Sequence, residues 1–485
     1  MRFRFAGFAA SMTVLLLAGC TVGPNYHRPA APGAPTWKEN AVPPPNPPNG
    51  TWKQAEPSDQ VLRGKWWLMY GDPQLNALED KVAVSNQTLQ VAMNQYFQAR
   101  EQVRVARSQY YPTLGAGASA GRTRNSYNEP NTVRGLTHYQ YNTYSLAGQA
   151  QWEPDFWGQA RRTVEQSRAN AQASAALLAN VELSVRAELA SDYFEMRGLD
   201  SQKELLDNTV ASYTDYLRLT QIRFKGGVAT ESDVALAQTQ LDTTRSQDID
   251  VEVARAQYQH AIATLIGVSP SVFTLPPMPL GEHIPQIPVG VPSQLLERRP
   301  DIAAAERQMD AANAQIGIAV SAFYPNISLS GNGGVLSGTP GTLIQGPSEM
   351  WSLGGSAFEL LFDAGRRHAI TQQARYAYDQ QVANYREIVL SAFQDVEDNL
   401  ASVRILDQES VAQAAAVAAA RRSLTISTNR YKGGVTTYLE VLTAQTAQLS
   451  NERTQEDIAT RQFVASVQLI RALGGGWDTS QLPKL

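Results

Sequence analysis

The chain is 485 residues long, and 43% of its residues are hydrophobic, 8% aromatic and only 18% charged. Its 41 Lys and Arg residues nearly balance 45 Asp and Glu residues, and the formal net charge of −4 gives no support for a nucleic-acid-binding protein. The single cysteine excludes a disulfide framework and a cysteine-based zinc cluster.

The first 19 residues have the pattern of a secretory signal peptide. Arg2 and Arg4 form a basic start, an apolar run begins at Phe5, and small residues stand just before Cys20. The run is too short to span a bilayer comfortably. Because the only cysteine stands where a bacterial lipobox has its lipid-modified residue, we expect the mature chain to begin at a lipidated Cys20. An ordinary signal peptide followed by an accidental cysteine is the alternative.

Lipidation at Cys20 would anchor the chain to a membrane. Two or more acyl chains hold a protein stably there, because each buried CH₂ is worth about 0.8 kcal/mol. Thr21, rather than Asp, follows the cysteine, and by resemblance to Gram-negative lipoproteins this favours the outer membrane. We expect this covalent lipid and no separate cofactor. In residues 20–65, eight prolines between Pro29 and Pro48 predict an extended tether without a core of its own.

The rest of the chain reads as a duplication. The sequence RFKGGVAT at 223–230 returns, almost unchanged, 207 residues later. We therefore expect two halves with one plan, at 66–267 and 295–474. A Pro-rich linker at 268–294 joins them, and we expect it at the equator of the molecule. A C-terminal tail follows at 475–485.

Each half predicts the same succession of a helix, a β-hairpin, a very long helix, a tight turn and a shorter helix. We expect the opening helices from Gln74 to Tyr110 and from Leu295 to Phe323, because the pattern stops before Pro112 and Pro325. The tight turns are expected at 225–230 and 432–437.

After the opening helices the pattern changes to period two, which is typical of β-strands. In 145–153 and again in 326–331, apolar or small residues alternate with mostly polar ones. We therefore expect β-hairpins at 113–153 and 326–362. Strands of about ten residues with aromatic side chains near their ends suit tilted membrane-spanning strands. A soluble β-hairpin in an α+β domain is the alternative.

Four membrane strands cannot form a sealed structure by themselves. Strands in lipid must close into a barrel, because an open edge leaves unpaired backbone groups in hydrocarbon. The smallest bacterial barrels have about eight strands, so several copies of the chain must share one barrel. Two copies would supply eight strands and three would supply twelve, and spacing alone does not decide between them.

The long helices predict a hollow tube. No proline interrupts residues 158–222, and the segment 366–429 matches them. At 1.5 Å per residue such a helix reaches about 100 Å. Lengths of this kind argue for coiled-coil-like packing, yet Gln, Asn, Ser and Thr interrupt the apolar stripes, as a solvated inner face requires. A solid helical bundle with a polar surface is the alternative.

Three motifs carry a resemblance to a known family: VGPNYHRP at 22–29, WWLMYGDPQLN at 66–76 and LLERRPDI at 295–302. Together they resemble the NodT branch of the TolC/OprM outer-membrane factor family. The resemblance implies an α+β membrane protein, a homotrimer that forms a 12-stranded transmembrane β-barrel in the Gram-negative outer membrane, continued through the periplasm by a long α-helical barrel. It also implies an exit duct of a tripartite efflux pump, with a periplasmic adaptor and an inner-membrane RND transporter as partners.

The same resemblance places both turns at a periplasmic tip that closes the duct and meets the adaptor. Asp233 and Glu440 are equivalent across the repeat, so three copies would place six carboxylates around one aperture. Like charges there repel unless they are solvated, partnered or protonated. Both residues also have capping-box spacing, with Thr230 and Thr437 respectively, which by itself only stabilises the start of a helix.

Three further tip residues are gate candidates. Tyr431, like Glu440, matches a position that contributes to the closed tip in the TolC pattern. Thr436 and Thr443 stand where TolC-like tips place Arg and Asp, so Arg223 or Arg430 is expected to substitute. The turn residues expected to contact the adaptor are Gly226, Gly227, Val228, Gly433, Gly434 and Val435.

We find no catalytic motif and expect no enzyme. The Gly-rich stretches fail the dinucleotide and nucleophile-elbow patterns. No two of the five His residues stand three or four apart, so we expect no His-rich metal site, whereas a carboxylate site stays open. Within transport, the rival functions are the outer-membrane duct of a protein-export or a metal-cation efflux system. A rival of another class is a structural lipoprotein that spans the periplasm as a solid coiled coil, which would not need the alternating strands.

Overall fold

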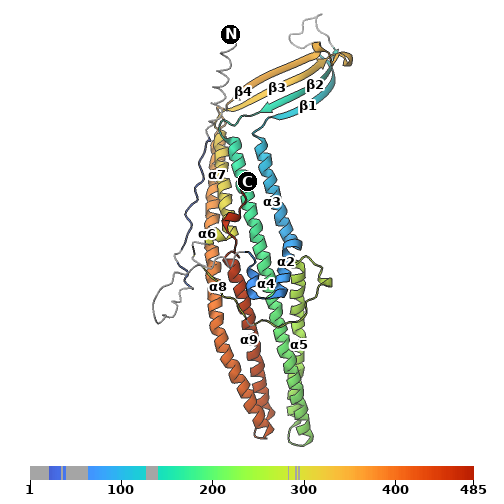
Figure 1. Ribbon diagram of the computed structural model, residues 1–485, viewed down its shortest axis with the longest axis vertical. Helices are drawn as coiled ribbons and strands as arrows, with labels where there is room; N and C mark the ends of the chain where they lie inside the picture. The colour runs from blue at the N-terminus through green and yellow to red at the C-terminus, as the bar shows by residue number, and fades with distance from the viewer. Residues whose placement is uncertain are drawn as a thin grey trace.

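The computed structural model describes residues 21–33, 36–39, 64–126, 140–281, 283–289, 292 and 295–485. The expected signal peptide, Cys20 and the greater part of the tether lie outside these residues. Figure 1 shows an elongated molecule with a β-sheet at one end and the tips of two long helical hairpins at the other.

The sheet is antiparallel, with the strand order β1-β2-β3-β4. Its strands are β1 (Thr113–Arg124), β2 (Gln140–Trp152), β3 (Asn326–Ser337) and β4 (Glu349–Phe358). β2 pairs with β3 from Tyr144 opposite Ser337 to Trp152 opposite Leu329. This pairing places the β-hairpins of the two halves side by side in one sheet.

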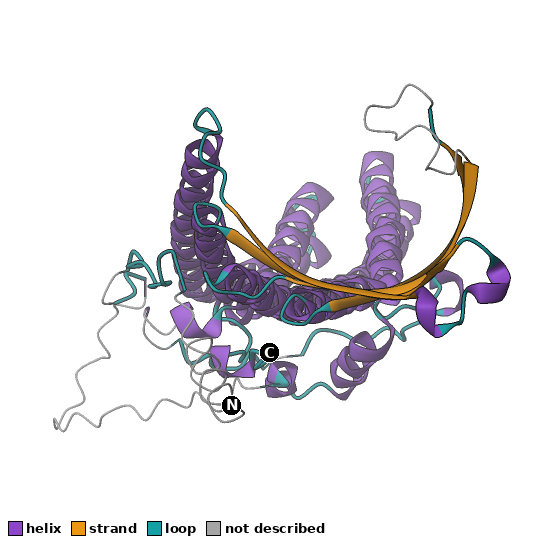
Figure 2. Cartoon of the chain, turned by 90° about the horizontal axis from the view of Figure 1, so that it is seen from above, coloured by secondary structure: helices purple, strands orange, loops and turns teal. Residues whose placement is uncertain are grey.

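The sheet is bent into an arc (Figure 2). Most of its side chains are exposed, and β1 and β4 each have one edge without a partner strand among the described residues. Open edges present rows of unpaired N–H and C=O groups. A four-stranded sheet with both edges open and little burial therefore requires further partners, because it has no core of its own.

The long helices of the second half repeat the lengths of the first. They are α4 (Gln159–Lys225), α5 (Glu231–Leu265), α8 (Arg366–Lys432) and α9 (Tyr438–Ala472). α4 and α8 have 67 residues each, and α5 and α9 have 35 each. Gly158 and Gly365 precede the long helices with φ of 85° and 86°, where glycine carries no Cβ penalty. None of the described helices is both long enough and apolar enough to cross a membrane.

The first opening helix is broken where a continuous helix from Gln74 to Tyr110 was expected. α2 (Pro73–Ser85) ends and α3 (Gln87–Ser108) begins around Asn86, whose backbone is extended. The Asn86 side chain accepts a hydrogen bond from Leu89 N at 2.8 Å and donates one to Leu265 O at 2.7 Å. The prediction is wrong here because Asn86 caps α3 and is held by the end of α5.

The second opening helix differs from its prediction near its start. α6 (Leu295–Arg298) ends before Arg299, and α7 (Pro300–Ser321) follows. Arg299 has φ −94° and ψ 122°, because the ring of a following proline disfavours the helical conformation. The expected continuous helix from Leu295 to Phe323 is therefore wrong at Arg299.

The largest hydrophobic cluster lies around the middle of α4. Leu189, Tyr193 and Phe194 of α4 pack there with residues of α2, α5, α9 and the 3-10 helix η1 (Trp66–Tyr70). Leu275, from the segment that joins the two halves, belongs to the same cluster. The joining segment therefore crosses the helices at mid-height.

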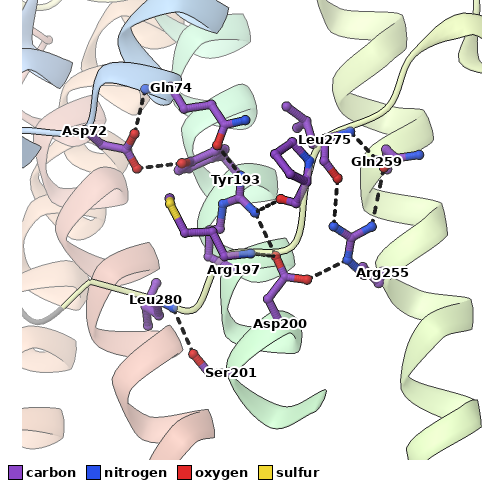
Figure 3. Close-up of polar contacts among 12 residues, drawn as sticks. Asp72, Gln74, Tyr193, Arg197, Asp200, Ser201, Arg255, Gln259, Leu275 and Leu280 are labelled. Carbon is purple, nitrogen blue, oxygen red and sulfur yellow. Dashed lines mark hydrogen bonds and ion pairs between the residues drawn. The ribbon is translucent and has the colours of Figure 1, made fainter. Parts of the chain in front are cut away.

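A buried network of charges holds this joining segment (Figure 3). Arg197 is 1% exposed and donates to Asp200 at 2.7 Å and to Pro276 O at 2.9 Å. Asp200 also pairs with Arg255 at 2.5 Å and accepts from Met278 N at 3.0 Å. Buried charges are tolerated when they are paired and hydrogen-bonded. Because backbone groups of the joining segment complete these bonds, the charges also fix its course.

Candidate functional site

Both tight turns lie at the free ends of the helical hairpins, at the opposite end of the molecule from the sheet (Figure 1). Gly227 and Gly434 have φ of 76° and 73°, a conformation that strains any other residue. Val228 and Val435, next in the chain, each donate a backbone N–H to the arginine five residues earlier at 2.9 Å. Their side chains are 65% and 72% exposed, so the two turns present the same apolar group outward.

A buried cluster joins the two hairpins close to the turns. Tyr213 and Leu217 of α4 pack in it with Tyr431 of α8 and Val441 of α9. Burial raises the pKa of Tyr213 to about 12, and its hydroxyl donates to Gln445 O at 3.1 Å. Tyr431 is only 3% exposed. This gate candidate therefore belongs to the packing between the hairpins rather than to the surface.

The two equivalent carboxylates have different partners. Asp233 accepts from the Thr230 backbone N–H and hydroxyl, both at 2.9 Å, and its own N–H donates to Thr230 Oγ1 at 3.2 Å, which completes a capping box. Glu440 Oε2 instead lies 3.2 Å from Arg430 Nη1. Thr437 makes no side-chain cap. The capping box expected there is wrong, because Arg430 engages the Glu440 carboxylate.

Both carboxylates are thus partnered within one chain. A hydrogen-bonded or ion-paired carboxylate repels a like charge less than a free carboxylate does. Across the described residues, no group of three or more His, Cys, Asp or Glu side chains is placed to hold a metal ion.

Arg223 makes contact across the two hairpins. Its guanidinium lies over the Tyr431 ring, with Cζ 4.7 Å from the ring centroid, and its Nη1 donates to Lys432 O at 3.2 Å. Arg223 Nε and the Tyr431 hydroxyl are buried and find no hydrogen-bond partner among the described residues. By contrast, the contacts of Asp233 given above stay within the α4–α5 hairpin, and the Arg430–Glu440 pair stays within the α8–α9 hairpin.

A second feature lies at the other end of the helices. Residues 21–33 and 36–39, here called the strap, contact α7 and α8 from the sheet downward (Figure 1). The strap starts beside Trp157, whose backbone oxygen accepts from Val22 N at 3.2 Å. Trp157 Nε1 donates to Pro325 O at 2.8 Å, immediately before β3. The first residues of the strap are therefore fixed at the helix-side end of the sheet.

Arg162, near the start of α4, holds this part of the strap. It is 3% exposed and donates to Val22 O at 3.3 Å, to Gly23 O at 3.3 Å and to Asn25 Oδ1 at 3.0 Å. α4 and α8 begin at Gln159 and Arg366, so Arg162 and Ala369 hold equivalent positions in the two helices. Sequence reasoning missed Arg162, because the pair Arg161 and Arg162 returns in the sequence as Arg366 and Arg367 and suggests no difference between the repeats.

The lower strap is bound as well. Trp37 is 4% exposed among side chains of α8 and α9. The backbone N–H groups of Lys38 and Glu39 donate to the Glu397 carboxylate at 2.8 Å and 3.0 Å. Arg28 donates to a tyrosine hydroxyl of α8 at 3.1 Å. The described part of the expected tether is therefore docked on the helices.

The sheet presents apolar side chains outward. Leu114, Trp351 and Leu353 are 80%, 79% and 82% exposed. At the helix-side end, Trp157 stacks on Tyr324 with 5.0 Å between ring centroids. Exposed apolar surface of this kind marks contact with a membrane or another protein, and aromatic pairs are favoured where such a surface meets water.

Comparisons with known proteins agree over almost the whole chain. The family model for outer membrane efflux protein matches residues 78–268 and again 291–475. Toluene efflux pump outer membrane protein TtgI of Pseudomonas putida is 30% identical over 469 residues, 96% of this chain and 98% of that protein. Cation efflux system protein CusC of Escherichia coli is 28% identical over 467 residues, 96% and 97% of the two chains. The solved structure of the outer-membrane channel OprN matches with a TM-score of 0.86 at 28% identity, covering 94% of this chain and 100% of that one.

Proposed function

This chain belongs to the outer membrane efflux protein family, and we propose that three copies of it form the exit duct of a tripartite efflux pump of the RND type. The observation that carries the proposal is the sheet, which has two open edges and exposed apolar side chains. In lipid such edges must pair and close. Three copies would join twelve strands into one barrel, with the long helices continuing it as a tube.

The relatives favour small molecules as the cargo. TtgI is named for toluene efflux and CusC for cation efflux, and the two are similarly close to this chain. We therefore propose that an inner-membrane transporter and a periplasmic adaptor supply small organic molecules to the duct. Cation efflux is the second candidate, because CusC matches nearly the full length. In both cases the protein conducts its cargo and carries out no reaction on it.

The proposal is tested by assembly and conductance. The purified protein should migrate on unboiled gels as a trimer that boiling converts to single subunits, and it should carry ion current in planar bilayers once its tip is opened. A lone subunit, or a trimer without a water-filled bore, contradicts the proposal. Co-expression with a transporter and adaptor in a strain lacking its own duct should restore tolerance to organic compounds. Restoration of metal tolerance alone favours the second candidate.

We propose that a lipid on Cys20 anchors each subunit beside the barrel. The position of the strap supports this. Thr21 Cα would lie 3.0 Å from a Cβ placed on Gly158, directly after Trp157. Thr21, the first described residue, therefore lies at the helix-side end of the sheet. Acyl chains on Cys20 would enter the leaflet that meets this end of the barrel.

We propose that the tip turns contact the adaptor, with Gly226, Gly227, Gly433 and Gly434 shaping the turns. The exposed Val228 and Val435 support this, because they repeat one apolar group at the free end of each hairpin. Cysteine introduced at either valine should crosslink to the helical hairpin of an adaptor. Ile344 is 87% exposed and lies between β3 and β4, so cysteine there is the control that should not crosslink. Crosslinks that arise only away from the turns contradict this contact.

A further inference from the structure

We infer that the one-methylene difference between Asp233 and Glu440 decides which arginine locks the tip. Asp233 leaves Arg223 free to bridge the two hairpins, whereas Glu440 keeps Arg430 inside its own hairpin. The inference rests on the proposed function as a duct with a closing tip. It adds Arg223 as the latch, and it adds the short side chain at position 233 as the reason that Arg223 stays available to contact the other hairpin.

The two arginines start from equivalent places. Arg223 and Arg430 lie in the last turn of helices of 67 residues each, and Asp233 and Glu440 stand at the third position of helices of 35 residues each. The turns between them have left-handed glycines with φ of 76° and 73° and the same N–H···O distance of 2.9 Å. Because the backbones match, the different contacts arise from the side chains.

Carboxylate length explains the difference. The longer Glu440 side chain reaches Arg430 on the preceding helix, at 3.2 Å. The Asp233 carboxylate stays against Thr230 at the start of its own helix, at 2.9 Å. No ion pair among the described residues involves Arg223. Its guanidinium therefore turns to the other hairpin.

The contacts that hold Arg223 on the other hairpin are weaker than an ion pair with a carboxylate would be. Arg223 contacts the face of the Tyr431 ring and Lys432 O, while its Nε and the Tyr431 hydroxyl lack partners among the described residues. A carboxylate binds a guanidinium through charge-assisted, often bidentate hydrogen bonds, which are stronger than contact with an aromatic face. A longer carboxylate at position 233 would therefore capture Arg223 and release the bridge.

The test is Asp233→Glu, measured as current at fixed voltage through purified trimers in planar bilayers. We expect about fivefold more current than in the wild type, as from Arg223→Ala, because one charge-assisted contact is lost. Folding should persist, because the backbone N–H of residue 233 still donates to Thr230 Oγ1 and so keeps the N-cap of the helix. Unboiled gels check the trimer in each variant.

Two matched controls separate the effect of carboxylate length on the current from the effect of losing the helix cap. Asp233→Ala removes the cap but leaves Arg223 on Tyr431, so current should stay at the wild-type level. Glu440→Asp makes the reverse change in the other repeat and leaves the latch untouched, so it should also stay closed. Combining Asp233→Glu with Arg223→Ala should give no more current than Arg223→Ala alone.

The outcomes distinguish the inference from the function on which it rests. If Arg223→Ala opens the trimer and Asp233→Glu does not, the inference is overturned and the duct stands. Equal opening by Asp233→Ala and Asp233→Glu also overturns it, because the cap would then be the cause. If the wild type and every variant carry no current, the proposed duct itself fails.

Discussion

Gly23 of the strap and Gly317 of α7 pass so closely that a Cβ on Gly23 would lie 2.5 Å from Gly317 Cα. Gly23 also has φ of 91°, so both space and backbone conformation require glycine there. A Cβ on Gly317 would in turn lie 2.9 Å from the Arg162 side chain. The close approach brings the strap backbone within reach of Arg162.

The first prediction is that Gly23→Ala displaces the upper strap, because the new methyl group would overlap Gly317. Hydrogen exchange in peptides covering residues 21–33 should become faster. Gly33→Ala is the control in the same segment, because a Cβ there meets nothing within 4 Å. Equal exchange in the two variants would show that the close approach does not hold the strap.

The second prediction is that Arg162→Ala lowers the free energy of unfolding by about 2–3 kcal/mol, because three partly buried hydrogen bonds from a charged donor to the strap are lost. Chemical unfolding in detergent measures the loss. Arg104→Ala is the surface control: its pair with Glu101 is largely exposed and is worth under about 1 kcal/mol. A loss no greater than in this control would remove the role of Arg162.

The third prediction concerns the crossing of α4 and α9. A Cβ on Gly198 would lie 2.0 Å from Thr460 Oγ1, and Thr460 is 5% exposed. Gly198→Ala should therefore lower the free energy of unfolding by about 1–3 kcal/mol through overpacking. Adding Thr460→Ala should recover part of the loss, since it removes the overlapping atoms. Failure of this rescue would mean that contact with Thr460 is not the cause.

The fourth prediction concerns pH and Glu79, which is 0% exposed. Burial raises its pKa from 4.5 to about 8, and Arg186, at 3.3 Å from Oε2 and shared with Glu182, only partly offsets this. The folded state keeps the proton up to about pH 8, whereas the unfolded chain releases it near pH 4.5. The stability that Glu79 contributes is therefore complete below that lower value and is lost as pH rises toward 8.

Glu79→Gln should remove this dependence. Between pH 5 and 8 the free energy of unfolding should fall less in the variant than in the wild type, by about 2–4 kcal/mol. Urea unfolding at both pH values measures the difference. Glu101→Gln, at an exposed site, should leave the wild-type slope unchanged. If the free energy of unfolding changes with pH by the same amount in Glu79→Gln and in the wild type, the prediction is contradicted.

The fifth prediction concerns Cys20. Labelled palmitate should enter the wild-type protein and be absent from Cys20→Ser, because this is the only cysteine of the chain. Incorporation that persists in the variant would place the lipid elsewhere. An unlabelled wild type would favour the ordinary signal peptide.

Part of this architecture could be predicted because it is local. The alternation with period two over 145–153 predicts a β-strand, and the absence of proline from 158–222 permits a long helix. Both patterns concern backbone hydrogen bonding and can be seen within each segment. The capping of α5 by Thr230 and Asp233 is also local, since the residues stand three apart. The return of the RFKGGVAT motif predicts the same turn between a long and a shorter helix in the second half.

The rest could not be predicted, because it depends on contacts between different helices and segments. Asn86 ends a helix early through Leu265, and Glu440 abandons its expected cap for Arg430 on the neighbouring helix. Arg162 reaches a strap about 140 residues earlier.

The sequence by itself determined the segments, the repeat and the need for more strands than one chain supplies. Each follows from backbone hydrogen bonding within a few residues or from counting. The tertiary structure alone decided which of two equivalent arginines crosses between the hairpins, and where the strap lies. Such choices are set by the reach of a side chain across a packed interface, a distance that no spacing along the chain records.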